Sequence, residues 1–199
     1  KPNTCVVVSY WMGRPAKRLH GLLAQMQKVD AGVPFDLVVV CNGGDERPLS
    51  LPRRFDDLRP IVLNRENCGF NLGAWEHGWR SVDGYEFFLF LQDDCFLKQA
   101  GWVYDFEFRI NHDSGIGLLG EMVVYDQMTW DYIREVEYTN FWPTVPEWPE
   151  PVHPIDTYKT LFDRHGIPWK NLGNHTPSII LFTSRRILEE VGGIPYFGL

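Results

Sequence analysis

The stretch Phe-Phe-Leu-Phe-Leu-Gln-Asp-Asp-Cys-Phe, residues 87–96, joins a run of five apolar residues to two adjacent carboxylates. An uninterrupted apolar run predicts a strand that is buried on both faces, as in a mostly parallel sheet. Carboxylates at the end of such a strand are costly to desolvate unless a cation or hydrogen bonds compensate them. Because ligands of open α/β sheets bind beyond the carboxyl ends of the strands, Asp93 and Asp94 indicate a metal-phosphate site. The alternative is an ordinary strand-to-turn exit, where Asp is common.

Apolar runs alternate with helical patterns on both sides of this stretch. Residues 5–10 and 36–42 predict two strands, and the Leu and Met residues between them recur at helical spacing. A strand, a helix and a strand in this order predict a βαβ unit with a right-handed crossover. The other predicted elements are strands at 61–64, 115–120 and 178–183, and helices at 72–82, 102–110, 156–165 and 185–191. Ser184 is the predicted N-cap of the last of these helices. The sequence therefore predicts a single α/β domain with a mostly parallel central sheet flanked by helices.

The regular alternation of apolar runs and helical spacing is weaker after residue 121. Residues 122–155 are rich in Trp, Tyr and Pro, and a segment of this length and composition predicts a functional loop or a lid. We expect residues 1–199 to form one domain, because this length is sufficient for one hydrophobic core. Truncation at the C-terminal end stays open, because the chain closes just after a predicted helix.

Composition excludes several classes of protein. The formal net charge of -7 and the lack of a basic block argue against nucleic acid as a ligand. The four cysteines are scattered without a Cys-x-x-Cys pair, which argues against a zinc site and favours reduced thiols in the cytoplasm. No apolar run approaches the roughly 18 to 20 residues that span a bilayer, and no signal peptide is visible. Peripheral association with a membrane stays open.

The segment Asn-Cys-Gly-Phe-Asn-Leu-Gly, residues 67–73, follows a predicted strand and opens a predicted helix. Glycines let backbone N–H groups approach an anion closely, and a helix N-terminus adds partial positive charge. Arg65, just ahead of this segment, supplies a charge that the overall composition lacks. The alternative is a Gly- and Asn-rich turn in which Asn71 is the N-cap of the helix.

Four strand-end motifs in this order resemble family 2 of the GT-A glycosyltransferases. They are Ser9-Tyr10, Cys-Asn-Gly-Gly-Asp at 41–45, the segment at 67–73, and Gln-Asp-Asp at 92–94. Residues 178–193, which contain Arg-Arg and Gly-Gly, are similar to a late region of the same family. Two positions depart from the family pattern. Cys41 stands where an Asp usually contacts the nucleobase, and Gln92 replaces the first carboxylate of the Asp-x-Asp motif.

The resemblance implies a GT-A type, Rossmann-like domain with hexosyl- or deoxyhexosyltransferase activity in polysaccharide biosynthesis. It implies a nucleotide-diphosphate-sugar donor, a Mn²⁺ or Mg²⁺ ion on the diphosphate, and a saccharide or other hydroxyl acceptor. Residues 1–121 would bind the nucleotide-sugar, and residues 122–199 would form the acceptor side. The residues implied in donor binding are Ser9, Tyr10, Asn42, Asp45, Arg65, Asn67, Gly69, Asn71, Gly73, Gln92 and Asp93. The implied metal ligands are Asp94 and His175.

A transferase that inverts the anomeric configuration needs a base to deprotonate the acceptor hydroxyl. In the family this base lies in an acidic pair after the Gly-Gly region, but residues 193–199 contain no carboxylate. Glu121 and Asp156 are the remaining candidates. Two other functions stay open. A non-catalytic nucleotide-sugar-binding module is favoured by the missing acidic pair, whereas a sugar nucleotidyltransferase is disfavoured because no Gly-rich phosphate loop follows the first predicted strand.

Overall fold

The computed structural model of the protein describes residues 1–122, 128–136, 153–164, 166, 168–173 and 179–195. The chain divides into two compact units. The first consists of Lys1–Glu121 together with Pro177–Leu199, and the second consists of Met122–Thr176. The strand and helix near the C-terminus thus belong to the same unit as the first 121 residues.

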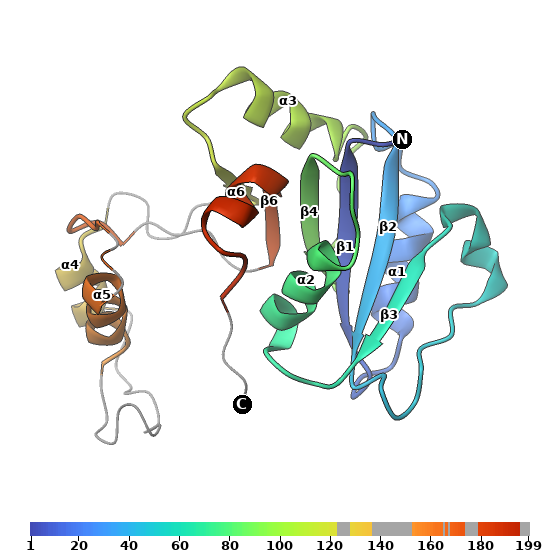
Figure 1. The fold of residues 1–199 in the computed structure, drawn as a ribbon, viewed down its shortest axis with the longest axis horizontal. Helices are drawn as coiled ribbons and strands as arrows, with labels where there is room; N and C mark the ends of the chain where they lie inside the picture. Colours follow the sequence, from blue (N-terminus) through green and yellow to red (C-terminus); the bar gives the residue numbers. More distant parts are fainter. Residues whose placement is uncertain (123–127, 137–152, 165, 167, 174–178, 196–199) are drawn as a thin grey trace. The chain divides into compact units, whose positions relative to one another are not determined.

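A six-stranded sheet of order β3-β2-β1-β4-β6-β5 forms the centre of the first unit (Figure 1). The strands are β1 (Thr4–Trp11), β2 (Phe35–Asn42), β3 (Ile61–Arg65), β4 (Phe87–Gln92), β5 (Leu118–Gly120) and β6 (Ile180–Ser184). Strands β3, β2, β1 and β4 are mutually parallel, whereas β6 is antiparallel to both β4 and β5. The mostly parallel sheet predicted from the apolar runs is confirmed.

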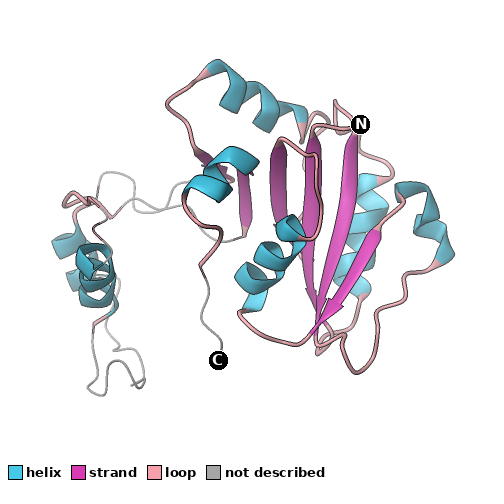
Figure 2. Ribbon diagram, viewed as in Figure 1, coloured by secondary structure: helices cyan, strands magenta, loops and turns pink. Residues whose placement is uncertain are grey.

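Helices cover both faces of this sheet (Figure 2). They are α1 (Lys17–Met26), α2 (Phe70–Arg80), α3 (Tyr104–His112) and α6 (Arg185–Glu190). Alternate residues of β1 point to opposite faces, so Val6 and Val8 pack in one core with α1 and α3, and Val7 packs in the other with α2 and α6. The predicted α/β layering is therefore confirmed.

Strand β4 is buried on both faces, as its apolar run predicts. Every residue from Phe87 to Leu91 is at most 4% exposed. The ring of Phe90 lies 5.6 Å from the ring of Trp75 on α2, measured between centroids. The Trp75 indole N–H also donates a hydrogen bond to the Leu91 carbonyl at 3.1 Å. Helix α2 therefore fixes the last apolar residue before the strand reaches its polar end.

The predicted caps of two helices have different outcomes. Asn71 is not the N-cap of α2, because the helix begins at Phe70 and Gly69 is its N-cap, with a φ of 71°. Glycine adopts this left-handed conformation without steric cost, which lets the chain enter the helix earlier than the side-chain pattern predicts. The N-cap predicted at Ser184 is confirmed, because its hydroxyl accepts a hydrogen bond from the Ile187 N–H at 3.2 Å.

The stretch 46–60, which has a loop composition rich in Pro and Arg, contains one turn of regular structure. Residues Arg53–Leu58 form a 3-10 helix that the sequence pattern does not predict. Its Phe55 side chain is buried and lies 5.6 Å from the His20 ring of α1, measured between centroids. Burial of one aromatic ring thus organises a stretch that local propensity leaves irregular.

The second unit contains α4 (Trp130–Val136) and α5 (Pro154–Arg164). Its described core consists of Trp130, Ile133 and Ile155. Helix α4 lies within residues 122–155, whose Pro- and aromatic-rich composition does not predict a helix.

All four cysteines lie in the described part of the chain, and they are free thiols. Burial raises the pKa of Cys5 to about 12 and that of Cys41 to about 11, so both thiols stay protonated near neutral pH. In the described residues, none of the helices combines the length and apolar character needed to cross a membrane.

The close packing of α2 on the sheet can be tested at Gly78. A Cβ atom there would lie 2.5 Å from Cγ1 of Val7 and 3.1 Å from Cγ2 of Val40. Gly78→Ala should therefore lower the free energy of unfolding by about 1–3 kcal/mol, measured by urea denaturation. Gly21→Ala is the matched control, because a Cβ on this helical glycine meets open space. It should raise stability by about 0.5–1 kcal/mol. A Gly78→Ala protein as stable as the Gly21→Ala protein would contradict the described contact.

Candidate functional site

A cavity of about 250 Å³ lies at the carboxyl ends of β1, β2 and β4, beside the N-terminal turn of α2. This is the edge of the sheet at which ligands of open α/β folds bind. The lining residues are Ser9, Tyr10, Trp11, Arg14, Asn42, Asn67, Phe70, Asn71, Gln92 and Asp93. Most of the residues singled out in the sequence for donor binding are thus brought together from four separate segments of the chain.

The pairing of β1 with β4 positions the two carboxylates Asp93 and Asp94 that follow β4, which we call the acidic turn. In the parallel register Ser9 lies opposite Gln92. The Ser9 hydroxyl donates a hydrogen bond to the Leu91 carbonyl at 3.3 Å, and the Asp93 N–H donates to the Ser9 carbonyl at 3.1 Å. The backbone of Asp93 is therefore held by β1, and its position follows from the strand pairing.

Arg65 holds the turn that precedes α2. Its guanidinium donates to the side-chain oxygen of Asn42 at 3.1 Å and to the Cys68 carbonyl at 2.9 Å. Asn42 in turn donates through Nδ2 to the Phe70 carbonyl at 2.7 Å. Arg65 is not among the lining residues. These hydrogen bonds join the end of β2 to the start of α2, so they set the width of the cavity between the two elements.

Gly69 and Gly73 shape the same turn without lining the cavity. A Cβ atom on Gly73 would lie 2.4 Å from the Cys68 carbonyl oxygen, a distance that no side chain tolerates. The Gly73 N–H donates to the Gly69 carbonyl at 2.7 Å. The glycines thus permit a tight turn, and this turn leaves Asn67 and Asn71 at the cavity wall.

The two carboxylates of the acidic turn have different surroundings. Asp93 lines the cavity, whereas Asp94 forms an ion pair with Arg18 of α1 at 3.1 Å. Burial, followed by the negative charge of Asp94, raises the pKa of Asp93 above its ordinary value. Its own backbone N–H and the charges of Arg14 and Arg18 act in the opposite direction. The ionised form of Asp93 is therefore less favourable than that of an exposed aspartate, and a bound cation would relieve this.

Asp93 and Asp94 are the side chains that could hold a cation at this edge. Among the residues that the structure describes, no three His, Cys, Asp or Glu side chains gather into a metal site. Mg²⁺ is often held by one or two carboxylates, with phosphate oxygens and water completing its shell, so two carboxylates suffice. The exposed Arg18–Asp94 pair is worth about 0–1 kcal/mol, so a divalent cation can displace it. His175 lies outside the described residues.

Three residues at the cavity carry no clear signal in the sequence. They are Trp11, Arg14 and Phe70. Trp11 is 45% exposed and Phe70 is 67% exposed, although both rings are large and apolar. The Arg14 guanidinium lies 5.9 Å from the Trp11 ring, and the Tyr10 hydroxyl donates to the Arg14 carbonyl. Arg14 therefore supplies positive charge next to the acidic turn. The only sequence signal for it is the Gly13-Arg14 pair after the first strand.

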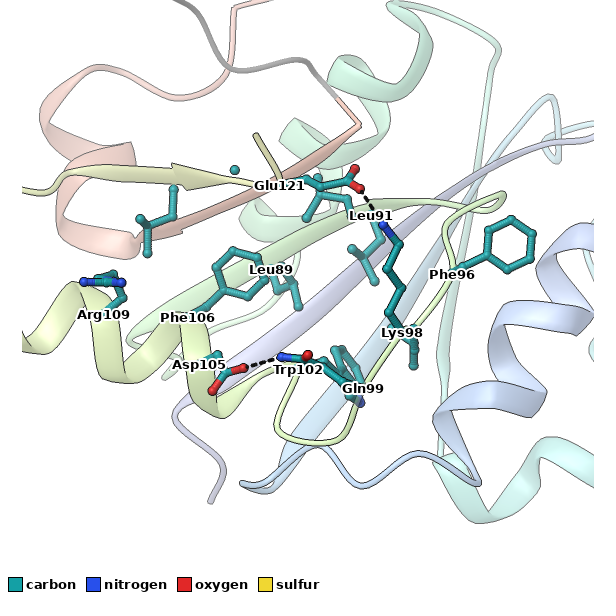
Figure 3. Close-up of a pocket in the computed structure, with 14 residues that line it drawn as sticks. Leu89, Leu91, Phe96, Lys98, Gln99, Trp102, Asp105, Phe106, Arg109 and Glu121 are labelled. Carbon is teal, nitrogen blue, oxygen red and sulfur yellow. Dashed lines mark hydrogen bonds and ion pairs between the residues drawn. The ribbon is translucent and has the colours of Figure 1, made fainter. Parts of the chain in front are cut away.

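The remaining candidates lie away from this cavity. Asp45 is exposed on the turn after β2 and is not a lining residue. Glu121 follows β5 and lines a second cavity, where its Oε1 atom lies 3.8 Å from Nζ of Lys98 (Figure 3). Asp156 belongs to α5 of the second unit and forms an ion pair with Arg134. The first cavity therefore holds donor-site candidates but neither candidate base.

Comparisons with known proteins find likeness in structure only. No protein-family model matches the sequence, and no curated protein matches it significantly. The mannosyltransferase PcManGT from Pyrobaculum calidifontis, solved in complex with GDP-Man and Mn²⁺, is 16% identical with a TM-score of 0.58. The match covers 98% of this chain and 48% of that chain, so this chain spans about half the length of the mannosyltransferase.

Weaker matches have lower TM-scores. The bifunctional glycosyltransferase WbbM is 12% identical with a TM-score of 0.47, covering 96% of this chain and 33% of that one. Residues 1–349 of TarS from S. aureus are 16% identical with a TM-score of 0.43, covering 85% of this chain and 50% of that one. The six-stranded mixed sheet with helices on both faces, together with the likeness to PcManGT over nearly the whole chain, shows that this protein has the fold of the GT-A glycosyltransferases.

Proposed function

We propose that this chain is a glycosyltransferase that moves a sugar from a nucleotide-diphosphate-sugar donor to a hydroxyl acceptor, with a divalent cation. One observation carries the proposal: Asp93, Asn67 and Asn71 meet in a cavity at the carboxyl ends of three parallel strands. The structurally similar mannosyltransferase is described in complex with GDP-Man and Mn²⁺, which supports the same class of ligand here. We propose a hexose or a deoxyhexose as the sugar that is transferred.

The donor would occupy the cavity with its nucleobase along Ser9 and Tyr10 at the end of β1. Asn67 and Asn71 would hydrogen-bond the ribose or the diphosphate through their amides. Both residues lie near the N-terminus of α2, where the helix dipole favours an anion. Arg14 would add the full positive charge that an acidic protein needs in order to hold a diphosphate.

Asp94 would be the main protein ligand of the cation, and Asp93 would share its charge. When bound, Mn²⁺ or Mg²⁺ acts as a Lewis acid that neutralises charge on the leaving diphosphate. When the cation displaces Arg18 from Asp94, the Arg18 guanidinium would remain close to the bound diphosphate and would pair with a phosphate oxygen. The acidic turn would thereby bind the donor indirectly, through a cation that contacts both its carboxylates and the diphosphate.

Glu121 is the better supported of the two candidate bases, because it follows β5 in the same compact unit as the acidic turn. In an inverting reaction the acceptor oxygen bonds to the anomeric carbon of the donor while the bond from that carbon to the diphosphate breaks. The proton of the acceptor hydroxyl passes to the Glu121 carboxylate. Lys98 Nζ lies 3.8 Å from this carboxylate and would help to orient it toward the acceptor hydroxyl.

The alternative is a non-catalytic module that binds a nucleotide-sugar. It is favoured by the uncharged Gln92 in the Asp-x-Asp position and by Cys41 in the position of the base-contacting Asp. Because burial raises the pKa of Cys41 to about 11, its thiol does not replace the negative charge of an aspartate. Transfer of sugar from donor to acceptor by the purified protein would distinguish the enzyme from the module.

The cation site can be tested by thermal melting with GDP, UDP, dTDP and CDP, each with and without Mn²⁺. At least one nucleotide should raise the melting temperature only when Mn²⁺ is present, by an amount equivalent to about 2.7 kcal/mol at one hundred times its Kd. Asp94→Asn should abolish the part of the shift that depends on Mn²⁺. Asp56→Asn, at an exposed carboxylate far along the chain, should retain it. An unchanged Mn²⁺-dependent shift in Asp94→Asn would refute the assigned ligand.

The raised pKa of Asp93 predicts a dependence on pH with a defined sign. Because the pKa is higher in the folded than in the unfolded protein, stability at this site is greatest below the unfolded pKa and falls as the pH rises through the raised value. Asp93→Asn should therefore be more stable than the parent in urea at pH 7, and this gain should vanish below the ordinary pKa of aspartate. The same variant should lose Mn²⁺-dependent nucleotide binding. A loss of stability at pH 7 would contradict the described electrostatics.

A further inference from the structure

The second cavity, of about 390 Å³, lies between α3 and the strands β4, β5 and β6 (Figure 3). Its size falls in the range of about 300–1,000 Å³ that is usual for small-molecule sites. All of its lining residues belong to the first unit. The apolar members are Leu89, Leu91, Phe96, Leu97, Trp102, Phe106, Leu119 and Ile180, and the polar side chains are Lys98, Gln99, Asp105, Arg109 and Glu121.

The polar side chains form a rim around an apolar floor. On one side Lys98 reaches across to Glu121, and on another the Gln99 amide donates to Asp105 at 3.0 Å, as Figure 3 shows. The rim contains two cations, Lys98 and Arg109, and two anions, Asp105 and Glu121, so its formal charges cancel. An apolar floor under a neutral, hydrogen-bonding rim fits a molecule with an apolar body and several hydroxyls, and it offers no net attraction to an anion.

Strand β4 connects the two cavities. Leu91 lines the second cavity, whereas the next residue, Gln92, lines the first. Successive side chains of a strand point to opposite faces, so this division follows from the pleat. Phe96 and Leu97, which follow the acidic turn after Cys95, also line the second cavity. Along the chain, the residues that line the first cavity here, Gln92 and Asp93, are therefore flanked on both sides by residues that line the second.

Strand register places Glu121 at the same end of the sheet as the acidic turn. The residue before Glu121 pairs with Leu181 of β6, and Leu181 pairs with Phe90 of β4. Glu121 is therefore level with Leu91, shortly before the strand reaches Asp93. A hydroxyl held at this part of the rim would lie next to a carboxylate and toward the donor cavity.

We propose that the second cavity is the acceptor subsite, and that it takes an uncharged glycoside with an aromatic or aliphatic aglycone. Except for Ile180, its lining residues lie within residues 89–121, and not in residues 122–199, to which the family resemblance assigns the acceptor side. This inference rests on the proposed function, since it names the acceptor of the same reaction. The aglycone packs against the apolar floor, which includes Phe106 and Leu119. The sugar lies at the rim, where Glu121 and Lys98 form hydrogen bonds with its hydroxyls. The chemistry that recognises the acceptor is burial of the apolar body together with hydrogen bonds to the sugar.

Two substitutions on β5 distinguish the effect of filling the cavity from the effect of placing a large residue on the strand. Leu119 lines the cavity, and the adjacent Leu118 does not and is 50% exposed. Leu119→Trp places a large ring in the cavity, whereas Leu118→Trp adds the same residue outside it. Both proteins are first melted with nucleotide and Mn²⁺, and an unchanged shift shows that the fold and the donor site are intact.

The probes are the 4-nitrophenyl glycosides of glucose, mannose and galactose, the free hexoses, and phenyl phosphate. Isothermal titration gives each Kd, and saturation-transfer NMR identifies the contacting protons. At least one aryl glycoside should bind about tenfold more tightly than its free hexose and than phenyl phosphate, with the strongest transfer to the aryl ring. Leu119→Trp should weaken this binding about tenfold, and Leu118→Trp should leave it unchanged.

Three results would overturn the inference. They are tighter binding of phenyl phosphate than of every glycoside, equal binding by Leu119→Trp and the parent, and no glycoside binding by a protein that does bind nucleotide with Mn²⁺. The last of these leaves the proposed donor site standing. Glycoside binding by a protein that takes up no nucleotide would instead refute the proposed function, and with it the acceptor role of the cavity.

Discussion

The parallel pairing of β4 with β1 is the constraint on which both cavities depend. It sets Ser9 opposite Gln92 and lets the Ser9 carbonyl hold the backbone of Asp93. Because β4 is buried on both faces, a slip by one residue would exchange its two sets of side chains. Leu91 would then point toward the first cavity and Gln92 into the second. One register thus positions the acidic turn and decides what lines each cavity.

The polar groups near the first cavity are largely occupied with one another in the free protein. Arg65 joins Asn42 to the turn before α2, and Arg18 pairs with Asp94. Asp93 is the exception, because burial and its acidic neighbour outweigh the arginines that favour its ionised form. Burial of an aspartate next to a second carboxylate lowers stability, and such perturbed groups are common at functional sites.

Several features were predictable because they depend on local chemistry. The apolar run of β4 predicts burial on both faces, and Ser184 predicts the start of α6. Local reasoning failed where a distant contact decides the conformation. Gly69 replaces Asn71 as the cap of α2 because the turn is tied to β2 through Arg65. Burial of Phe55 against α1 likewise produces a helical turn that the composition of its segment does not predict.

The sequence by itself determined the alternation of strands and helices, the mostly parallel sheet and the polar residues at the strand ends, because periodicity and strand termination are local properties. Only the tertiary structure decided which of these residues share a cavity. It brought Trp11, Arg14 and Phe70 to the first cavity and placed Glu121 beside the second. It also engaged Arg65 in the turn before α2. The physical reason is that proximity across the sheet is set by strand order and register, which join residues far apart in the chain.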